Sequence, residues 1–210
     1  MNWRKRYDVD GVTQLRLMTM PGYHTVKDYV QSWVSSIIHQ QGSGFSPPQD
    51  LTRYHLWQHR EKFPHESSFI AKSRFTTPPT AIANILLGDH TRDALRRIGL
   101  ESWEPMDEGM GWLGFRIIRP GYGDGYPLSC KNWGASKDVV SFWLPMFGFG
   151  AEYSLKYVPG SHQKEYKSYL PSESKFTKDE LRLAPDEHVV TTSEHVAPGN
   201  ALMYGPQVLH

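Results

Sequence analysis

This chain of 210 residues has a single cysteine, Cys130, and it lacks any long apolar segment. One cysteine excludes a disulfide within the chain and indicates a reducing compartment. No run of about 18 apolar residues is present, so we expect no transmembrane helix. No apolar stretch follows the initial methionine, as it would in a secretion signal. These absences together predict a cytoplasmic protein.

The chain also lacks an excess of charge of either sign. Lysine plus arginine total 23 against 22 acidic residues, which gives no field for attracting nucleic acid or an anionic membrane. The short basic opening at residues 3–6 is interpreted as a solvated terminus rather than a binding arm. We therefore expect no nucleic-acid or membrane partner.

Several catalytic signatures are missing as well. The sequence contains no Gly-x-Ser-x-Gly elbow, no phosphate-binding loop and no His-Glu-x-x-His pair. Residues 121–125 (Gly-Tyr-Gly-Asp-Gly) lack the spacing of a dinucleotide-binding turn. What the chain does have is 39% hydrophobic and 13% aromatic residues, enough for one globular domain over residues 1–210 with an aromatic-rich interior or cleft.

Hydrophobic spacing divides the domain into two parts. Residues 1–111 are predicted to be mainly helical, with apolar positions at helical spacing and with Thr25 as the N-cap of the first helix. The predicted helices span residues 25–41, 79–87 and 91–98, and the predicted strands span 112–120, 139–146, 152–158, 188–196 and 201–204. A polar insertion at 164–183 has a short predicted helix from Thr177. The pattern predicts an α+β fold in which residues 112–210 form a double-stranded β-helix, a jelly-roll or cupin-like barrel, preceded and flanked by the N-terminal helices.

Three segments in the last third of the chain resemble one oxygenase family. They are residues 142–146 (Phe-Trp-Leu-Pro-Met), 157–162 (Tyr-Val-Pro-Gly-Ser-His) and 198–204 (Pro-Gly-Asn-Ala-Leu-Met-Tyr), the last running on to His210. This order resembles the phytanoyl-CoA dioxygenase-like branch of the Fe(II)/2-oxoglutarate-dependent dioxygenases. The resemblance implies an oxidoreductase that hydroxylates a small polar metabolite, with Fe(II) as cofactor and 2-oxoglutarate as cosubstrate. It also implies that His210 is a metal ligand.

The other metal ligands of the family, a His-x-Asp/Glu pair, are altered in this sequence. This chain offers Tyr122-x-Asp124, which keeps the acid and lies 86 residues before His210 (210 minus 124). Asp124 is thus the candidate carboxylate ligand, although an aspartate between two glycines also reads as a turn residue. In an alternative register residues 129–131 occupy the slot and both ligands are lost. His162 is a weaker candidate, because the resemblance places it after a strand turn and not on the metal.

The cosubstrate needs a cationic partner for its carboxylate. The family takes an arginine from a strand beyond the distal histidine, whereas this sequence stops at His210, so we expect a truncated chain that lacks the last barrel strand. The remaining candidates for binding 2-oxoglutarate are Arg116, Arg119 and Lys131, which equally suit ordinary salt bridges at strand ends. The candidates for lining a substrate pocket are Tyr122, Tyr126, Asn132 and Trp133.

Two other functions remain open. The altered His-x-Asp pair and the cation at Lys131 also suit a metal-free jelly roll that binds or isomerises a sugar or a nucleotide-linked sugar. The chain could equally be a degenerate, non-catalytic member of the family. In each case the expected partner is a small molecule, and a homodimer is left open.

Overall fold

The computed structural model describes residues 3–40, 46–57, 75–106, 111–117, 129–131, 139–169 and 180–210. Its helices are α1 (Trp3–Asp10), α2 (Met20–His39), α4 (Thr80–Leu86) and α5 (Asp89–Arg97), with the 3₁₀ turns η1 (Leu51–Leu56), η3 (Ala151–Tyr153) and η4 (Ser161–Gln163). Its strands are β1 (Val12–Arg16), β2 (Phe75–Thr76), β3 (Leu113–Gly114), β4 (Ser129–Lys131), β5 (Ser141–Trp143), β6 (Ser168–Tyr169), β7 (Glu180–Leu183) and β8 (Asn200–Tyr204). The α+β class predicted from the sequence is confirmed.

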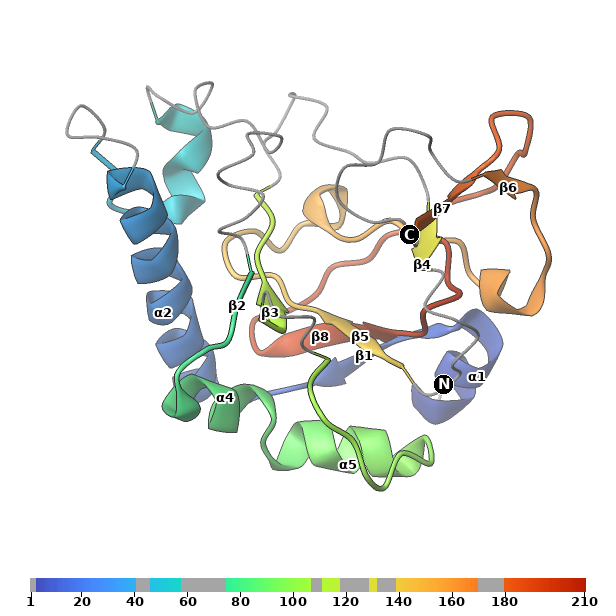
Figure 1. Cartoon of the computed structure of the whole chain (residues 1–210), viewed down its shortest axis with the longest axis horizontal. Coiled ribbons are helices and arrows are strands. Elements are labelled where there is room, and N and C mark those ends of the chain that lie inside the picture. The colour runs from blue at the N-terminus through green and yellow to red at the C-terminus, as the bar shows by residue number, and fades with distance from the viewer. Residues whose placement is uncertain are drawn as a thin grey trace.

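The described strands form small antiparallel sheets. The central sheet has the order β1-β8-β5, the second has the order β4-β7-β6, and β2 pairs with β3. Figure 1 shows α4 and α5 running along the lower side of the central sheet, α2 standing at its left, and the β4-β7-β6 sheet at the upper right. Within the part of the chain that the structure describes, these sheets stay separate and do not close into the expected barrel.

Strand β8 lies at the centre of the main sheet because it is the most apolar of the three strands. Its residues Ala201, Leu202 and Met203 are fully buried, as expected for a strand covered on both faces. The register places Tyr204 opposite both Val12 of β1 and Ser141 of β5. Residues directly opposite each other in an antiparallel sheet point to the same face, so these three side chains share one side of the sheet.

The two faces of the central sheet belong to different hydrophobic clusters. Ala201 packs into the larger cluster, formed mainly by α2, α4 and the residues around η1. Leu202 and Tyr204 point to the opposite face and pack into the smaller cluster. The buried members of this smaller cluster are Val12, Tyr157, Val196, Leu202, Tyr204 and Val208. The smaller cluster packs the segments around Tyr157 and Val208 against β8. The predicted metal ligand, His210, comes two residues after Val208.

Helix α2 begins earlier than the sequence predicted. It starts at Met20, and its N-cap is Thr19, whose hydroxyl accepts a hydrogen bond from the Gly22 amide at 3.3 Å. Thr25, the predicted N-cap, lies inside the helix and donates its hydroxyl to the Pro21 carbonyl at 3.1 Å. Proline is well tolerated in a first turn, where its missing N–H would have no helical partner. The helix therefore extends through Pro21 and Gly22, which the periodicity alone did not include.

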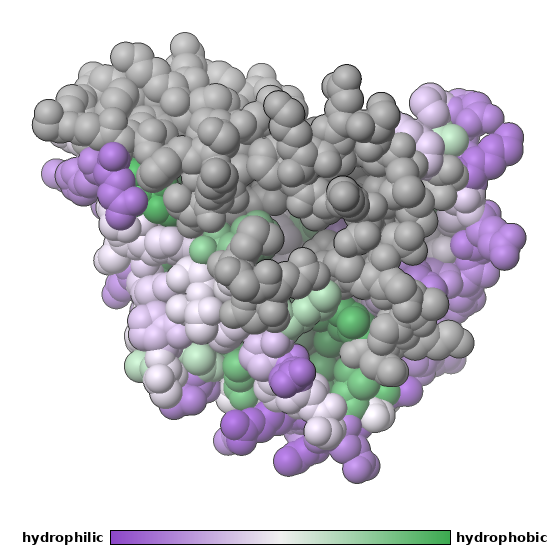
Figure 2. Space-filling model, in the orientation of Figure 1, coloured by the Kyte–Doolittle hydropathy of each residue, from purple (hydrophilic) through white to green (hydrophobic). Residues whose placement is uncertain are grey.

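Helices α4 and α5 confirm the predictions for residues 79–87 and 91–98 to within two residues at each end. Helix α5 is amphipathic: Thr91, Ala94 and Leu95 are buried, whereas Arg92, Asp93, Arg96 and Arg97 are exposed. Figure 2 shows hydrophilic side chains along the lower rim of the molecule, where α5 runs, and hydrophobic side chains above them. Helix α5 thus closes one side of the fold with an outer polar surface. Among the described residues, no helix is both long and apolar enough to span a membrane.

The strand predictions fared less well. Strand β8 matches the prediction for 201–204, and β5 occupies the centre of the predicted 139–146 strand. Only residues 113–114 of the predicted 112–120 strand are in a strand, and residues 118–120 lie outside the described part. The predicted strands at 152–158 and 188–196 are reduced to a single bridge between Tyr157 and Thr192. In the insertion at 164–183, the structure has strands β6 and β7, and residues 177–179, the start of the predicted short helix, lie outside the described part.

The N-terminal segment is an ordered part of the fold. Residues 3–6, interpreted from the sequence as a solvated terminus, begin helix α1, and β1 follows it directly. Strand β1 pairs along its whole length with β8. Helix α1 has no fully buried residue, and polar contacts with distant segments help to hold it in position.

Candidate functional site

The structure describes only some of the residues predicted for the site. His210 and Arg116 are described with their side chains, and Lys131 is described by its backbone in β4, opposite Glu180 of β7. The other predicted site residues lie outside the described residues: Arg119, Tyr122, Asp124, Tyr126, Asn132 and Trp133. The site can therefore be built upward from His210 and Arg116.

His210 is held in a defined orientation by its own main chain. Its Nδ1 lies 2.8 Å from the carbonyl oxygen of Val208. A neutral imidazole that donates from Nδ1 to a carbonyl carries its lone pair on Nε2. Such a second hydrogen bond is the usual way in which proteins orient a metal-binding histidine. With Nδ1 as the donor in this contact, Nε2 is the ring nitrogen that would bind a metal ion.

The segment before His210 is buried and firmly attached. Val208 is fully buried and Leu209 is 4% exposed. The Leu209 amide donates to the Ser161 hydroxyl at 3.0 Å, and the Leu209 carbonyl accepts from the Val158 amide at 2.9 Å. Both polar groups of the Leu209 backbone are therefore paired with the segment that contains the Pro-Gly turn.

Tyr204 lies directly beside His210. The two rings have centroids 4.7 Å apart and planes inclined by 56°. Burial raises the pKa of the Tyr204 phenol to about 12, while a side-chain hydrogen bond with Ser141 and the positive charge of Arg116 oppose this rise. The phenol therefore stays protonated at neutral pH and lies within electrostatic reach of the Arg116 guanidinium.

Tyr204 thus connects two residues that the sequence assigned to different roles. His210 was predicted as a metal ligand, and its ring lies beside Tyr204. Arg116 was predicted as a carboxylate partner, and its charge lowers the pKa of the Tyr204 phenol. Tyr204 and Ser141 were not among the predicted site residues. Tyr204 could have been found from the sequence, because it ends an apolar predicted strand shortly before the candidate ligand His210. Ser141 carries no such signal, because its position depends on the pairing of β5 with β8.

The same face of the sheet carries Trp143, opposite Leu202. Trp143 packs against the smaller hydrophobic cluster. On this face β1 presents Gln14 opposite Leu202, and Asn200 lies opposite Arg16. The face is therefore apolar around Leu202 and becomes polar toward the far end of β8.

His162, the weaker candidate ligand, has a different environment. Its Nε2 lies 3.3 Å from the carbonyl oxygen of Asp8. Its Nδ1 is buried against Gly11, so closely that a side chain at that glycine would collide with the ring. The ring therefore packs between α1 and β1, which fits a structural role for His162.

Within the described residues, no group of three or more His, Cys, Asp or Glu side chains is arranged to hold a metal ion. Asp124, the proposed carboxylate ligand, lies outside them. No protein-family model matches the chain, and no curated protein matches its sequence.

Proposed function

We propose that this chain is an Fe(II)/2-oxoglutarate-dependent dioxygenase of the phytanoyl-CoA dioxygenase-like type, built on a jelly-roll barrel and hydroxylating a small polar metabolite. The observation that carries the proposal is the orientation of His210. Its Nδ1 is paired with the Val208 carbonyl, and its ring lies beside Tyr204. The charge of Arg116 lowers the pKa of the Tyr204 phenol. An oriented imidazole suits a metal ligand, and a guanidinium whose charge acts on the neighbouring tyrosine suits a carboxylate cosubstrate.

The donor set fits the proposed cofactor in kind. His210 and Asp124 would supply a nitrogen and an oxygen ligand, the types that non-haem iron uses. When bound, iron with 2-oxoglutarate and O₂ would supply the oxidising chemistry that hydroxylates the substrate and converts 2-oxoglutarate to succinate and CO₂. Arg116 would hold a cosubstrate carboxylate through charge-assisted hydrogen bonds. The further proposed carboxylate partners are Arg119 and Lys131, and the proposed substrate-lining residues are Tyr122, Tyr126, Asn132 and Trp133.

The proposal is tested by anaerobic titration of the protein with Fe(II) in the presence of 2-oxoglutarate. The expected result is a weak visible charge-transfer band that saturates at one iron per chain, and that is lost in both His210→Ala and Asp124→Ala. His39→Ala is the matched control, because His39 is exposed at the end of α2, and it should retain the band. Full iron occupancy in Asp124→Ala would show that the Tyr122-x-Asp124 register is wrong.

Absence of the band in the unsubstituted protein would overturn the dioxygenase proposal. The metal-free jelly roll would then become the leading hypothesis. Saturable binding of a sugar or a nucleotide-linked sugar, unaffected by a chelator, would support that alternative.

A further inference from the structure

The segment 157–163 (Tyr-Val-Pro-Gly-Ser-His-Gln) lies between the N-terminal helix and the residues that precede His210. The family resemblance gives this motif no ligand role, yet it contains one of the few fully buried serines among the described residues, Ser161, which is 2% exposed. A buried hydroxyl is retained when it has a hydrogen-bonding task. The contacts of this segment show what that task is.

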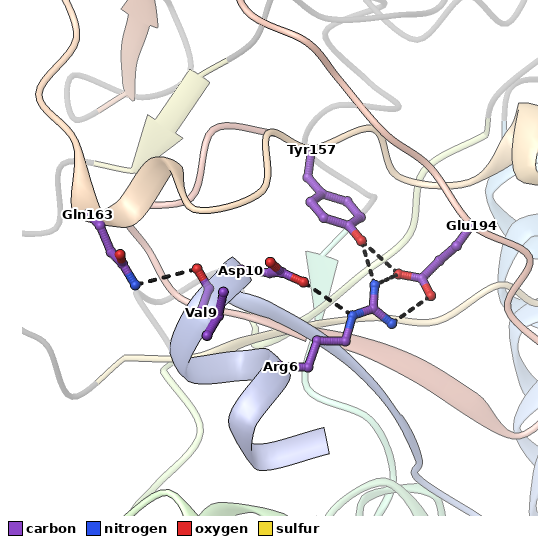
Figure 3. A network of polar contacts seen from close by, with 6 residues as sticks. All are labelled: Arg6, Val9, Asp10, Tyr157, Gln163 and Glu194. Carbon is purple, nitrogen blue, oxygen red and sulfur yellow. Dashed lines mark hydrogen bonds and ion pairs between the residues drawn. The ribbon is translucent and has the colours of Figure 1, made fainter. Parts of the chain in front are cut away.

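One side of the segment caps the C-terminal end of α1. The last carbonyls of a helix have no partner within it. Here the Gly160 amide donates to the Asp10 carbonyl at 2.9 Å. The Gln163 side-chain amide donates to the carbonyls of Asp8 and Val9, at 2.8 and 3.4 Å, as Figure 3 shows for Gln163 and Val9. The turn thus supplies α1 with a non-local C-cap.

A second set of contacts holds α1 from the other end of the segment. The Tyr157 hydroxyl accepts from Arg6 at 2.8 Å and donates to Glu194 at 2.8 Å. Arg6 is also 3.5 Å from the Asp10 carboxylate. Figure 3 shows Arg6 lying between Asp10 on one side and the Tyr157–Glu194 pair on the other. Helix α1 is therefore attached to both ends of the segment 157–163.

The opposite side of the segment holds the residue next to His210. The Ser161 hydroxyl accepts the Leu209 amide at 3.0 Å, and the Val158 amide donates to the Leu209 carbonyl at 2.9 Å. The Ser161 bond holds the peptide that joins Val208 to Leu209, and the Val158 bond holds the peptide that joins Leu209 to His210. Since Nδ1 of His210 bonds to the Val208 carbonyl, the ring orientation depends on the same short stretch of backbone.

We propose that Ser161 is a positioning residue for His210, and that the segment 157–163 is a clasp that couples the docking of α1 to the orientation of this imidazole. The metal-binding part of this inference rests on the proposed function. The clasp itself does not, because it is defined by hydrogen bonds among residues of the chain. Loss of the Ser161 hydroxyl frees the Leu209 amide, loosens the backbone beneath His210 and lowers the metal affinity without removing a ligand.

The test compares Ser161→Ala with Ser154→Ala in the full chain. Ser154 is also buried, at 6% exposure, but its hydroxyl has no hydrogen-bond partner among the residues that the structure describes. Both variants therefore remove one buried serine hydroxyl, and only the first removes a bond to the His210 segment. Ser161→Cys, which keeps the size of the side chain and offers a weaker acceptor, replaces Ser161→Ala should that variant fail to fold.

The first measurement is metal-free. Hydrogen exchange of the Leu209 amide should rise by about tenfold or more in Ser161→Ala, as expected when a hydrogen bond of ordinary strength is lost. It should stay within about twofold in Ser154→Ala. The nitrogen chemical shifts of the His210 imidazole, recorded at one fixed pH, should report a mixture of tautomers in Ser161→Ala only. Unchanged exchange and unchanged imidazole shifts would overturn the clasp.

The second measurement is the affinity for Fe(II), read anaerobically from the charge-transfer band. Its dissociation constant should rise about 10- to 100-fold in Ser161→Ala, the usual effect of removing a group that supports a metal ligand. Ser154→Ala should match the unsubstituted protein. Equal affinity in all three proteins would overturn the positioning role of Ser161. If the unsubstituted protein binds no iron, the proposed function fails, and the hydrogen-exchange and imidazole measurements still decide the clasp.

Discussion

The guanidinium of Arg6 meets the carboxylate of Glu194 through two hydrogen bonds. Nη1 of Arg6 donates to Oε2 at 3.0 Å and Nη2 donates to Oε1 at 2.6 Å, joining positions 188 residues apart. The two side chains are 28% and 22% exposed, so the pair is partly shielded from water. The Glu194 carboxylate and the neighbouring Tyr157 raise the pKa of Arg6 further above its usual range. This bidentate pair anchors α1 to the segment that precedes β8.

Arg6→Ala is expected to lower the free energy of unfolding by about 1–3 kcal/mol. The charge-assisted bonds to Glu194 and Tyr157 are lost, and both partners remain partly buried without their donor. The matched control is Arg97→Ala. Arg97 also pairs with a carboxylate, that of Asp93 at 2.9 Å, but both side chains are 60% exposed, so the loss should stay below about 0.5 kcal/mol. Urea unfolding measures both. Equal losses would mean that the Arg6 pair contributes no more than a surface pair.

Tyr157 should make the protein less stable at alkaline pH. Burial raises the pKa of the Tyr157 phenol well above its usual value of 10.0, and the hydrogen bond to the Glu194 carboxylate raises it further. Below this usual value both folded and unfolded chains are protonated, so the stabilisation is fully present. Above it the unfolded chain ionises first, and the stabilisation is lost as the pH rises toward the raised pKa of the folded state.

The expected result is that Tyr157→Phe flattens the decline in the free energy of unfolding above about pH 10. The decline should not vanish, because the pKa values of Tyr7, Tyr23 and Tyr204 are also raised by burial. Urea unfolding at several pH values gives the slope. Tyr153→Phe is the control, since that side chain is exposed, and it should leave the slope unchanged. An unaltered slope in Tyr157→Phe would contradict the prediction.

Gly11 is expected to tolerate no side chain. Its φ is +76°, and an added Cβ would collide with Nδ1 of His162 and lie 2.6 Å from Cγ2 of Val208. Gly99 has a similar φ of +92°, but nothing lies within 4 Å of its added Cβ. Gly99→Ala should therefore lower the free energy of unfolding by only about 1–2 kcal/mol, the cost of a positive φ for a residue that has a Cβ. Gly11→Ala should lower the free energy of unfolding by about 2 kcal/mol more than Gly99→Ala, because the added methyl group overpacks a filled space. Equal losses, measured by thermal or urea unfolding, would show that the His162 ring moves aside without cost.

The sequence predicts those helices and strands whose own residues show which side is buried. Helix α5 has a clear stripe of buried residues, and β8 is buried and mainly apolar from Ala201 to Tyr204, so both were predicted. Helix α1 was missed because it buries no whole residue, and its C-cap comes from Gly160 and Gln163, about 150 positions away. No window of the sequence contains both the helix and its cap.

The candidate site divides in the same way. A histidine after the Pro-Gly-Asn strand was visible from the sequence, and the structure gives it an oriented ring. The neighbours Ser141 and Tyr204 come together through the register of β5 on β8, and Ser161 reaches Leu209 across 48 positions. Such pairings follow from the folded topology and not from spacing along the chain. The other predicted site residues lie outside the described part and remain predictions: Arg119, Tyr122, Asp124, Tyr126, Asn132 and Trp133.

Substitution of Arg116 tests the proposed binding of 2-oxoglutarate separately from the proposed binding of Fe(II). The Arg116 side chain is exposed, and its charge lowers the pKa of the Tyr204 phenol, whose ring lies beside His210. We expect Arg116→Gln to raise the dissociation constant for 2-oxoglutarate by about tenfold or more, because a bidentate charged donor to a carboxylate contributes about 1.5–3 kcal/mol. Arg116→Lys should rescue only part of this loss, since an ammonium cannot reproduce the planar fork. The affinity for Fe(II) alone should stay unchanged in both variants.

Calorimetric titration with 2-oxoglutarate in the presence of Mn(II) measures the effect, with the exposed Arg92→Gln on α5 as control. An unchanged affinity for 2-oxoglutarate in Arg116→Gln would assign the carboxylate to another cation, and a parallel loss of Fe(II) affinity would mean that Arg116 acts through the position of His210.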